Sequence, residues 1–305
     1  MRTVSVVIPT YNRAGLIGQA IDSVLAQAYP QVEIIVADDG STDDTATAVA
    51  AYGDRVRYLA LSHRGLPAAT RNAGIRAAHG EFLAFLDSDD LFLPDKLAVQ
   101  SAALEAQPAA ALVYSNGVYF RTTPDAPVGR VLDGLPTPSG RVFGALLTGN
   151  FLAPPVVLMR RAALDSVGLF DESPEFFAVE DFDLWLRLAA HAPFIYAPGA
   201  VAAIRRHGSS ISRDTARLRR GVLNVLAACD RRLAQTMRQY PAARHEAYAL
   251  SHAAVAAAEV HQRHWGQAMA HGLSAGAHLV RTPGLGLPAL RAWRQRSRIR
   301  GDSAR

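Results

Sequence analysis

Apolar runs with the length of β-strands alternate with helical stretches through the first half of the chain. Residues 4–8 are apolar except for Ser5, as expected of a strand that is covered on both faces of its sheet. Further strands are predicted at residues 32–37, 55–61 and 81–86. The segments between these strands have apolar residues at helical spacing and end at Pro or Gly, so helices are predicted there. The order β-α-β-α-β-α-β is typical of a parallel sheet with crossover helices.

Residues that favour helix ends set the expected helix boundaries. Asn12 is the predicted cap of the first helix, and Ser41 with Asp44 three residues later predicts a capping arrangement for the second. Pro67 is expected to open the third helix and Gly80 to close it.

Beyond residue 94 the expected elements become irregular. They are a helix over 94–107, a strand at 111–114, a Pro- and Gly-rich loop over 122–140, a short helix over 161–167 and a helix over 180–190. Residues 142–159 carry no charge, but their glycines and paired prolines exclude a membrane-spanning helix. We expect a short helix, a loop and a buried strand at 156–159 there.

The composition changes after His207. Residues 213–280 are rich in Ala, Arg, Leu and His at helical spacing and predict three or four helices. We therefore expect an α/β domain over residues 1–210 and an α-helical extension with a basic tail over residues 211–305.

Composition excludes several classes of protein. Half of the 305 residues are apolar and 19% are charged, which suits a folded protein with a substantial core rather than a disordered chain. The single cysteine, Cys229, cannot form an internal disulfide or a Cys-based zinc site. Lys96 is the only lysine, so no Walker P-loop is present. The first apolar run stops at residues 9–12, too early for a signal peptide, and a cytoplasmic location is expected.

The net charge of +5 is unevenly distributed. Arginines gather in residues 205–220 and again in residues 291–305. Two interpretations stay open: a solvated helix face with a charged tail, or peripheral contact with an anionic membrane surface or a lipid-linked phosphate. Binding to nucleic acid is not expected, because no basic and aromatic interleaving accompanies the charge.

Polar clusters follow three of the first four predicted strands, at residues 9–12, 38–41 and 87–90. Right-handed crossovers bring the carboxyl ends of parallel strands to one edge of the sheet, where α/β proteins bind their ligands. Asp87 and Asp89 are hard oxygen ligands, which suit Mg²⁺ or Mn²⁺. The structural alternative is that Asp87 caps the following helix.

Asp39 also has two interpretations. It can accept a hydrogen bond from a nucleobase or a ribose, or it can form a common Asp-Gly turn with Gly40.

Four segments carry a resemblance to a known family over residues 3–210: VSVVIPTYNRAGLIGQAIDSVLAQ, VEIIVADDGSTDDT, FLAFLDSDDLFLPDKL and VEDFDLWLRL. Their order and spacing resemble the family-2 glycosyltransferases of GT-A fold. The resemblance implies an α/β fold with a mixed Rossmann-like sheet and helices on both faces. It also implies a nucleotide-diphosphate sugar as donor.

The resemblance assigns roles to particular residues. Those expected around the nucleotide sugar are Pro9, Tyr11, Asp39, Arg71, Asp87 and Ser88. Asp87, Asp89 and His207 match positions near the metal, which bridges to the donor diphosphate. Asp181 matches the catalytic base of inverting members. The structural alternatives are an exposed helical arginine for Arg71, helix-dipole complementation for Asp181 and a solvated side chain for His207.

The predicted reaction transfers one sugar to an acceptor hydroxyl with inversion, because one base acts on the face opposite the leaving nucleoside diphosphate. The acceptor is expected to be a cell-surface glycan or a lipid-linked saccharide. The chain lacks the Q-x-x-R-W motif of processive synthases, so a non-processive enzyme is predicted. The alternatives are a catalytically silent binding module and a sugar nucleotidyltransferase; no G-x-G-x-x-G motif follows the first strand, as a dehydrogenase would require.

Overall fold

The computed structural model describes residues 2–206, 215–261 and 264–281. The chain divides into two compact units. The first comprises Met1–Val142 and Phe151–Ser210, and the second comprises Phe143–Asn150 and Ile211–Arg305. The eight residues Phe143–Asn150, which the sequence pattern placed in the α/β domain, therefore group with the helical unit.

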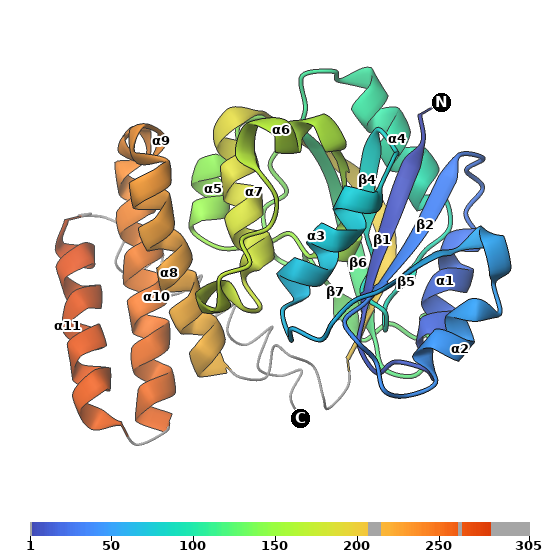
Figure 1. The fold of residues 1–305 in the computed structure, drawn as a ribbon. Helices are drawn as coiled ribbons and strands as arrows, with labels where there is room; N and C mark the ends of the chain where they lie inside the picture. The colour runs from blue at the N-terminus through green and yellow to red at the C-terminus, as the bar shows by residue number, and fades with distance from the viewer. Residues whose placement is uncertain (1, 207–214, 262–263, 282–305) are drawn as a thin grey trace. The chain divides into compact units, whose positions relative to one another are not determined.

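Within the described residues, a nine-stranded sheet forms the centre of the first unit (Figure 1). Its strands are β1 (Val4–Thr10), β2 (Val32–Asp38), β3 (Arg57–Ala60), β4 (Phe82–Phe85), β5 (Leu91–Phe92), β6 (Leu112–Phe120), β7 (Gly129–Arg130), β8 (Val157–Arg160) and β9 (Phe194–Arg205). The strand order is β3-β2-β1-β4-β8-β6-β9-β5, with β7 paired to β6. Strands β3, β2, β1 and β4 are parallel, as predicted, and β8 is antiparallel to both β4 and β6.

Strand β9 was not predicted, although it has twelve residues and pairs in parallel with β6. Its sequence contains Pro198 and Gly199, which interrupt the apolar alternation that marks a strand. The pairing with β6 shifts register between Tyr114 and Gly117, so the two strands accommodate an irregular segment.

The helices of the first unit flank this sheet. They are α1 (Ile17–Leu25), α2 (Thr45–Ala50), α3 (Pro67–Ala77), α4 (Lys96–Ala106), α6 (Leu164–Val167) and α7 (Glu180–His191). Helix α3 lies against β1 and β2, while α4 packs against β6, β8 and β9. One core cluster joins buried residues of the strands, such as Val6, Val36 and Phe82, to Ile21 and Leu97 of the helices. This burial of apolar side chains fixes the edge at which the parallel strands end.

Two predicted helix caps are wrong. Helix α1 begins after Leu16 and α2 after Asp44, neither with a side-chain cap. The Asn12 amide oxygen instead accepts a hydrogen bond from the Thr42 N–H at 2.8 Å, and the Ser41 hydroxyl accepts one from the Asn12 N–H at 2.8 Å. These contacts tie the loop after β1 to the loop after β2.

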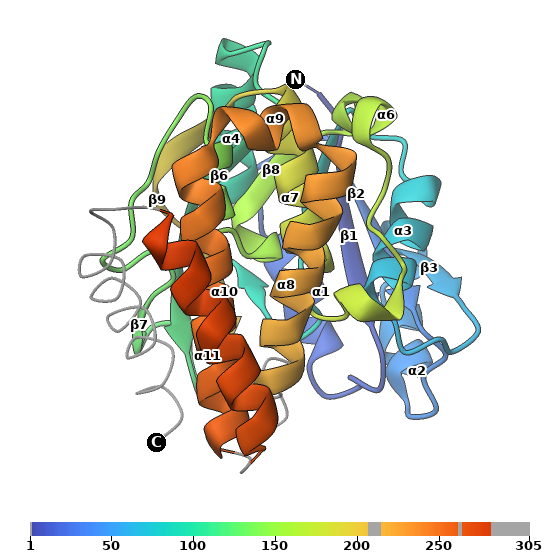
Figure 2. The ribbon, with the colours of Figure 1, turned by 90° about the vertical axis from the view of Figure 1, so that its left-hand side faces the viewer.

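The second unit is helical within the described ranges (Figure 2). It contains α5 (Phe143–Leu147), α8 (Thr215–Arg232), α9 (Ala234–Gln239), α10 (Pro241–His261) and α11 (Trp265–Val280). The four helices α8 to α11 confirm the prediction for residues 213–280. Helix α10 packs along α11 and also contacts α8 and α5. Asp230 of α8 accepts hydrogen bonds from Arg244 and Tyr248 of α10 at 2.7 to 2.8 Å, which joins these two helices.

Candidate active site at the carboxyl edge of the sheet

The polar clusters after β1, β2 and β4 lie at one edge of the sheet, because these strands are parallel neighbours in register. Thr10 pairs with Asp38 across β1 and β2, and the Asp39 N–H donates to the Thr10 carbonyl at 2.9 Å. Val7 of β1 pairs with Phe85 of β4, and Asp87 lies two residues beyond the end of β4. The predicted grouping of these clusters is confirmed.

Asp39 organises the side of this edge next to β2. Its carboxylate oxygens accept the backbone N–H groups of Arg64 at 2.9 Å and Gly65 at 2.8 Å. His63 Nδ1 lies 3.0 Å from Asp39 Oδ2, and the His63 ring stacks on Tyr11 with ring centres 4.3 Å apart. Tyr11 is 40% exposed, so part of this aromatic pair is accessible to a ligand.

His63 was not identified from the sequence. It lies in a loop between β3 and α3, within an unremarkable polar segment. Only its contacts with Tyr11 and Asp39 in the folded protein identify His63 as a residue of the site.

Asp38, next to Asp39, stabilises the loop. Its Oδ1 accepts the Ser41 N–H and hydroxyl, and its Oδ2 accepts the Tyr58 hydroxyl at 2.6 Å. Burial of Tyr58 and this hydrogen bond raise the pKa of the Tyr58 phenol. Asp38 is therefore fully engaged in structure, which leaves Asp39 as the carboxylate of this pair that faces the Tyr11 side.

Arg71 joins two of the predicted functional segments. Its Nη2 donates to Asp87 Oδ1 at 2.7 Å and its Nη1 to Glu180 Oε1 at 2.5 Å. The Arg71 side chain is 7% exposed, so the expectation of an exposed helical arginine is wrong. Burial alone lowers the pKa of Arg71, but Asp87, Glu180 and Asp181 raise it overall, so the guanidinium stays charged.

Glu180 and Asp181 open helix α7, after Ala178 in the left-handed region at φ +65°. The buried carboxylate of Glu180 is the counterion of Arg71, a role that its position at a helix N-terminus does not predict. Asp181 Oδ1 accepts the Phe182 N–H at 2.7 Å. Arg71 thus brings the start of α7, where Asp181 lies, to the Asp87 loop.

Three carboxylates crowd the loop after β4. Asp90 is buried, and burial together with Asp87 and Asp89 raises its pKa well above the ordinary value. The Asp90 carboxylate accepts the Arg205 N–H at 2.8 Å, and Arg205 Nε donates to the Asp89 carbonyl at 3.0 Å. Asp87 does not cap α4, which begins after Asp95. The structural alternative for Asp87 is therefore wrong.

The other predicted residues are placed as follows. Pro9 is in β1 opposite Ala37, and Ser88 is buried in the loop between Asp87 and Asp89. His207 lies outside the described residues. In the part of the chain that the structure describes, no group of three or more His, Cys, Asp or Glu side chains is arranged as a metal site.

Three buried polar atoms at this edge have no hydrogen-bond partner within the described residues: Thr10 Oγ1, Arg71 Nε and Glu180 Oε2. Buried polar atoms are nearly always paired in folded proteins. Their concentration beside the Asp87 loop indicates a site that a polar ligand or ordered water completes.

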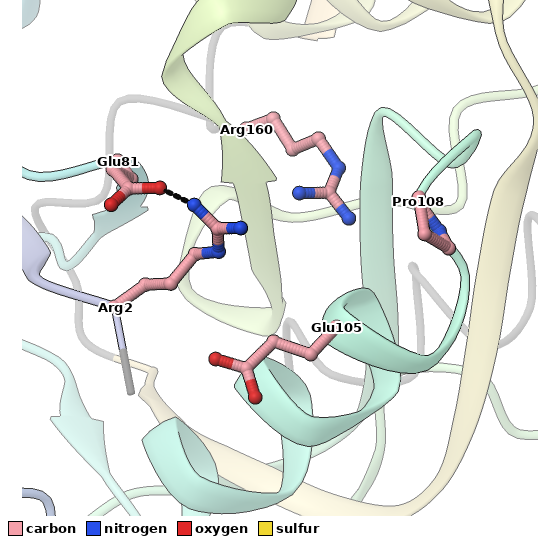
Figure 3. Close-up of a pocket in the computed structure, with 5 residues that line it drawn as sticks. All are labelled: Arg2, Glu81, Glu105, Pro108 and Arg160. Carbon is pink, nitrogen blue, oxygen red and sulfur yellow. Dashed lines mark hydrogen bonds and ion pairs between the residues drawn. The ribbon is translucent and has the colours of Figure 1, made fainter.

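A cavity of 470 Å³ lies elsewhere, near the amino ends of the strands (Figure 3). It is lined by Arg2, Glu81, Glu105, Pro108 and Arg160, and Arg2 forms an ion pair with Glu81. Arg2 and Glu81 precede β1 and β4, so this cavity is at the edge opposite to Asp39 and Asp87. It contains none of the residues predicted from the sequence.

The family model of Glycosyl transferase family 2 matches residues 5–168, more than half of the chain. This match covers Tyr11, Asp39, Arg71 and Asp87. The chain belongs to glycosyl transferase family 2.

Curated relatives match about three fifths of this chain. An uncharacterized glycosyltransferase of Rickettsia typhi is 34% identical over 60% of this chain and 58% of its own length. The UDP-Glc:alpha-D-GlcNAc-diphosphoundecaprenol beta-1,3-glucosyltransferase WfgD of Escherichia coli is 30% identical over 61% of this chain and 69% of its own. The chain thus spans a little over half the length of the Rickettsia typhi relative.

Solved structures confirm the GT-A fold of the family. Staphylococcus aureus TarS (residues 1–349, in complex with UDP-GlcNAc) has a TM-score of 0.63 at 17% identity, over 90% of this chain and 89% of that one. The mannosyltransferase PcManGT of Pyrobaculum calidifontis, in complex with GDP-Man and Mn²⁺, has a TM-score of 0.63 at 22% identity, over 98% of this chain and 80% of that one. The mixed sheet and the helical C-terminal region were both predicted from the sequence.

Proposed function

We propose that this family-2 glycosyltransferase is an inverting, non-processive enzyme that moves one sugar from a nucleotide-diphosphate sugar to an acceptor hydroxyl. The observation that carries the proposal is the Arg71 bridge, which brings the Asp87 loop and the Asp181 end of α7 together. A donor site and a base are thereby assembled at the carboxyl edge of the sheet, where α/β folds bind ligands.

The nucleotide end of the donor is assigned to the side of Tyr11 and Asp39. The partly exposed Tyr11 ring, backed by His63, offers a stacking surface for a base. Asp39 Oδ1 accepts one backbone N–H and keeps a lone pair for a base or ribose donor, whereas Oδ2 accepts the Gly65 N–H and also lies 3.0 Å from His63 Nδ1. UDP-GlcNAc in TarS and GDP-Man in PcManGT support a nucleotide-sugar donor, with uracil and guanine as the two bases to test first.

The loop after β4 fits a divalent cation. Asp87 and Asp89 provide hard oxygen ligands. Burial is the largest cause of the raised pKa of Asp90, and the charges of Asp87 and Asp89, which a cation would offset, add to it. Asp87, Asp89 and, by resemblance, His207 would hold Mg²⁺ or Mn²⁺. When bound, such an ion supplies positive charge to the departing diphosphate. Mn²⁺ is present in the PcManGT complex.

Asp181 is assigned as the base that takes the proton from the acceptor hydroxyl. Glu180 cannot take this role as readily, because one of its oxygens is committed to the buried Arg71. With a single carboxylate base and no protein nucleophile, the acceptor oxygen attacks the anomeric carbon directly. The product then has inverted configuration.

The acceptor class follows from the relatives. WfgD acts on a diphosphoundecaprenol-linked saccharide, and the Rhizobium meliloti proteins ExoO and ExoU are named for succinoglycan biosynthesis. We infer a saccharide acceptor, free or lipid-linked, in polysaccharide synthesis.

Thermal-shift binding tests the donor site. UDP, GDP and dTDP are each added with and without Mn²⁺ to the wild type, to Asp89→Ala and to the control Asp165→Ala in α6. We expect one diphosphate to raise the Tm in the presence of metal, with the shift lost in Asp89→Ala and kept in Asp165→Ala. Absence of any shift with a folded wild type would contradict the proposal and favour a catalytically silent binding module.

A further inference from the structure

Helix α11 presents its large apolar side chains to solvent. Among the described residues, the three most exposed large hydrophobic side chains are Met269 at 67%, Leu273 at 73% and Val280 at 82%. They are spaced by four and seven residues, so they share one face of the helix. We call these three residues the outer face of α11.

The side chains on the opposite side of α11 are small or polar. Ala268 and Ala275 are buried there, and α10 is the helix that lies along α11 (Figure 2). His271 and His278 reach the α10 residues His252 and His245, with Nδ1 atoms 2.9 and 3.1 Å apart. A helix of a protein surrounded by water normally turns its large apolar residues toward its neighbour. Helix α11 does the reverse, so its outer face is suited to an apolar partner.

Charge near this helix indicates which partner. Residues 265–280 contain no Asp, Glu, Lys or Arg, whereas residues 281–305 contain seven arginines and one aspartate. Arg281 follows the helix directly, and the other six arginines stand at residues 291–305, after nine uncharged residues. An apolar helical face near such a positive segment suits an anionic bilayer, which offers acyl chains and negative headgroups at adjacent depths.

We propose that the outer face of α11 docks on an anionic lipid surface, with the helix lying in the plane of the interface. Met269, Leu273 and Val280 enter the boundary between headgroups and acyl chains, and the arginines of residues 281–305 attract the negative headgroups. No helix in the described ranges is long and apolar enough to span a bilayer, which agrees with docking at its surface. The proposal does not depend on transferase activity.

A second copy of the chain fits the outer face less well. In a symmetric pair of α11 helices packed in parallel, the two copies of Arg281 lie side by side at the helix ends and repel. Three exposed side chains also offer little area compared with the roughly 1,200–2,000 Å² that stable protein interfaces bury.

Vesicle sedimentation with the full chain tests the proposal without donor or acceptor. The vesicles contain phosphatidylcholine alone or phosphatidylcholine mixed with phosphatidylglycerol. The variant is Met269→Gln with Leu273→Gln. The matched control is Val99→Gln with Val128→Gln, which changes two exposed apolar side chains of the first unit, 43% and 55% exposed. Circular dichroism verifies that each protein is folded.

We expect the wild type and the control to bind anionic vesicles about tenfold more strongly than neutral ones, and the α11 variant to lose about tenfold in binding. Raising the salt from about 0.05 M to about 0.5 M should release the wild type. Equal binding of variant and control would overturn the proposal. A dimer in analytical ultracentrifugation that the variant abolishes, without any vesicle binding, would also overturn it. A variant that binds vesicles no less than the wild type but melts at a lower temperature would overturn it as well.

Discussion

At the scale of single residues, Arg71 holds the candidate active site together. Its guanidinium is buried between Asp87 and Glu180, with an unpaired Nε beside them. Removal of one member of such a buried group leaves charges without a counterion. We infer that Arg71 is a positioning residue, because both of its Nη donors already bind protein carboxylates.

Replacing Arg71 with Met should therefore destabilise the first unit strongly. The expected loss is about 3–5 kcal/mol of unfolding free energy, because Asp87 and Glu180 then face each other without a cation. Urea denaturation measures it. Arg64→Met is the matched control, since Arg64 pairs with Glu172 while 53% exposed and should change stability by less than about 1 kcal/mol. Similar losses of unfolding free energy in the two variants would show that the buried Arg71 bridge stabilises the fold no more than an exposed ion pair does.

A separate prediction concerns the role of Asp181 as the base in the reaction. Asp181→Asn keeps the shape of the side chain but removes the base, so kcat should fall by about 10²–10⁴-fold. The Tm shift caused by the nucleoside diphosphate should be unchanged, because Asp181 is assigned to the acceptor. A variant that turns over at the wild-type rate would show that another group takes the proton.

At the scale of elements, the contact between α3 and β1 places Arg71. Gly74 allows α3 to approach the strand, because a Cβ at this position would lie 2.4 Å from Val7 Cγ1. The φ of Gly74 is not in the left-handed region, so the glycine serves close packing rather than a turn. The fold thus requires a residue without a Cβ at position 74, about one helical turn from Arg71.

Gly74→Ala should destabilise the protein by about 1–3 kcal/mol, because the strand or the helix must shift. Gly272→Ala is the matched control in α11, where no atom lies within 4 Å of the added Cβ. That change should stabilise the helix by up to about 1 kcal/mol. Thermal unfolding compares the two, and Val7→Ala combined with Gly74→Ala should recover part of the loss. Equal effects of the two glycine substitutions would contradict the close-packing argument.

At the scale of the whole molecule, the second unit carries a pH dependence of its own. Burial is the largest cause of the lowered pKa values of His245, His252 and His278, and their neighbours Arg244, Arg281 and His271 add to it. Asp230 opposes the shift for His245 and His278. In the folded state these histidines are therefore neutral at pH values where the unfolded chain already binds protons.

Because the unfolded state binds more protons below the ordinary histidine pKa of 6.5, stability should fall as the pH drops below that value. Hydrogen-exchange protection of α10 and α11 at about pH 7.5 and about pH 5.5 measures this effect, with protection lower at the acidic pH. His252→Gln should reduce the difference. Protection that does not change with pH would contradict the assignment of neutral, buried histidines.

The sequence alone determined the order of strands and helices in the first half, the four C-terminal helices and the edge at which the Asp39 and Asp87 loops meet. These features follow from apolar periodicity and from the handedness of crossovers, which are encoded locally along the chain. The four motif segments, among them those around Asp87 and Asp181, together indicated the family.

Tertiary structure alone decided which partners these residues have. Arg71 and Glu180 are 109 positions apart, and nothing in either local pattern predicts their pairing. The stack of His63 on Tyr11 and the pairing of β9 with β6 depend in the same way on which surfaces pack together. The sequence also did not predict that the large apolar side chains of α11 face solvent. A periodic helix has two faces, and only the packing of α11 on α10 decides which of them is exposed.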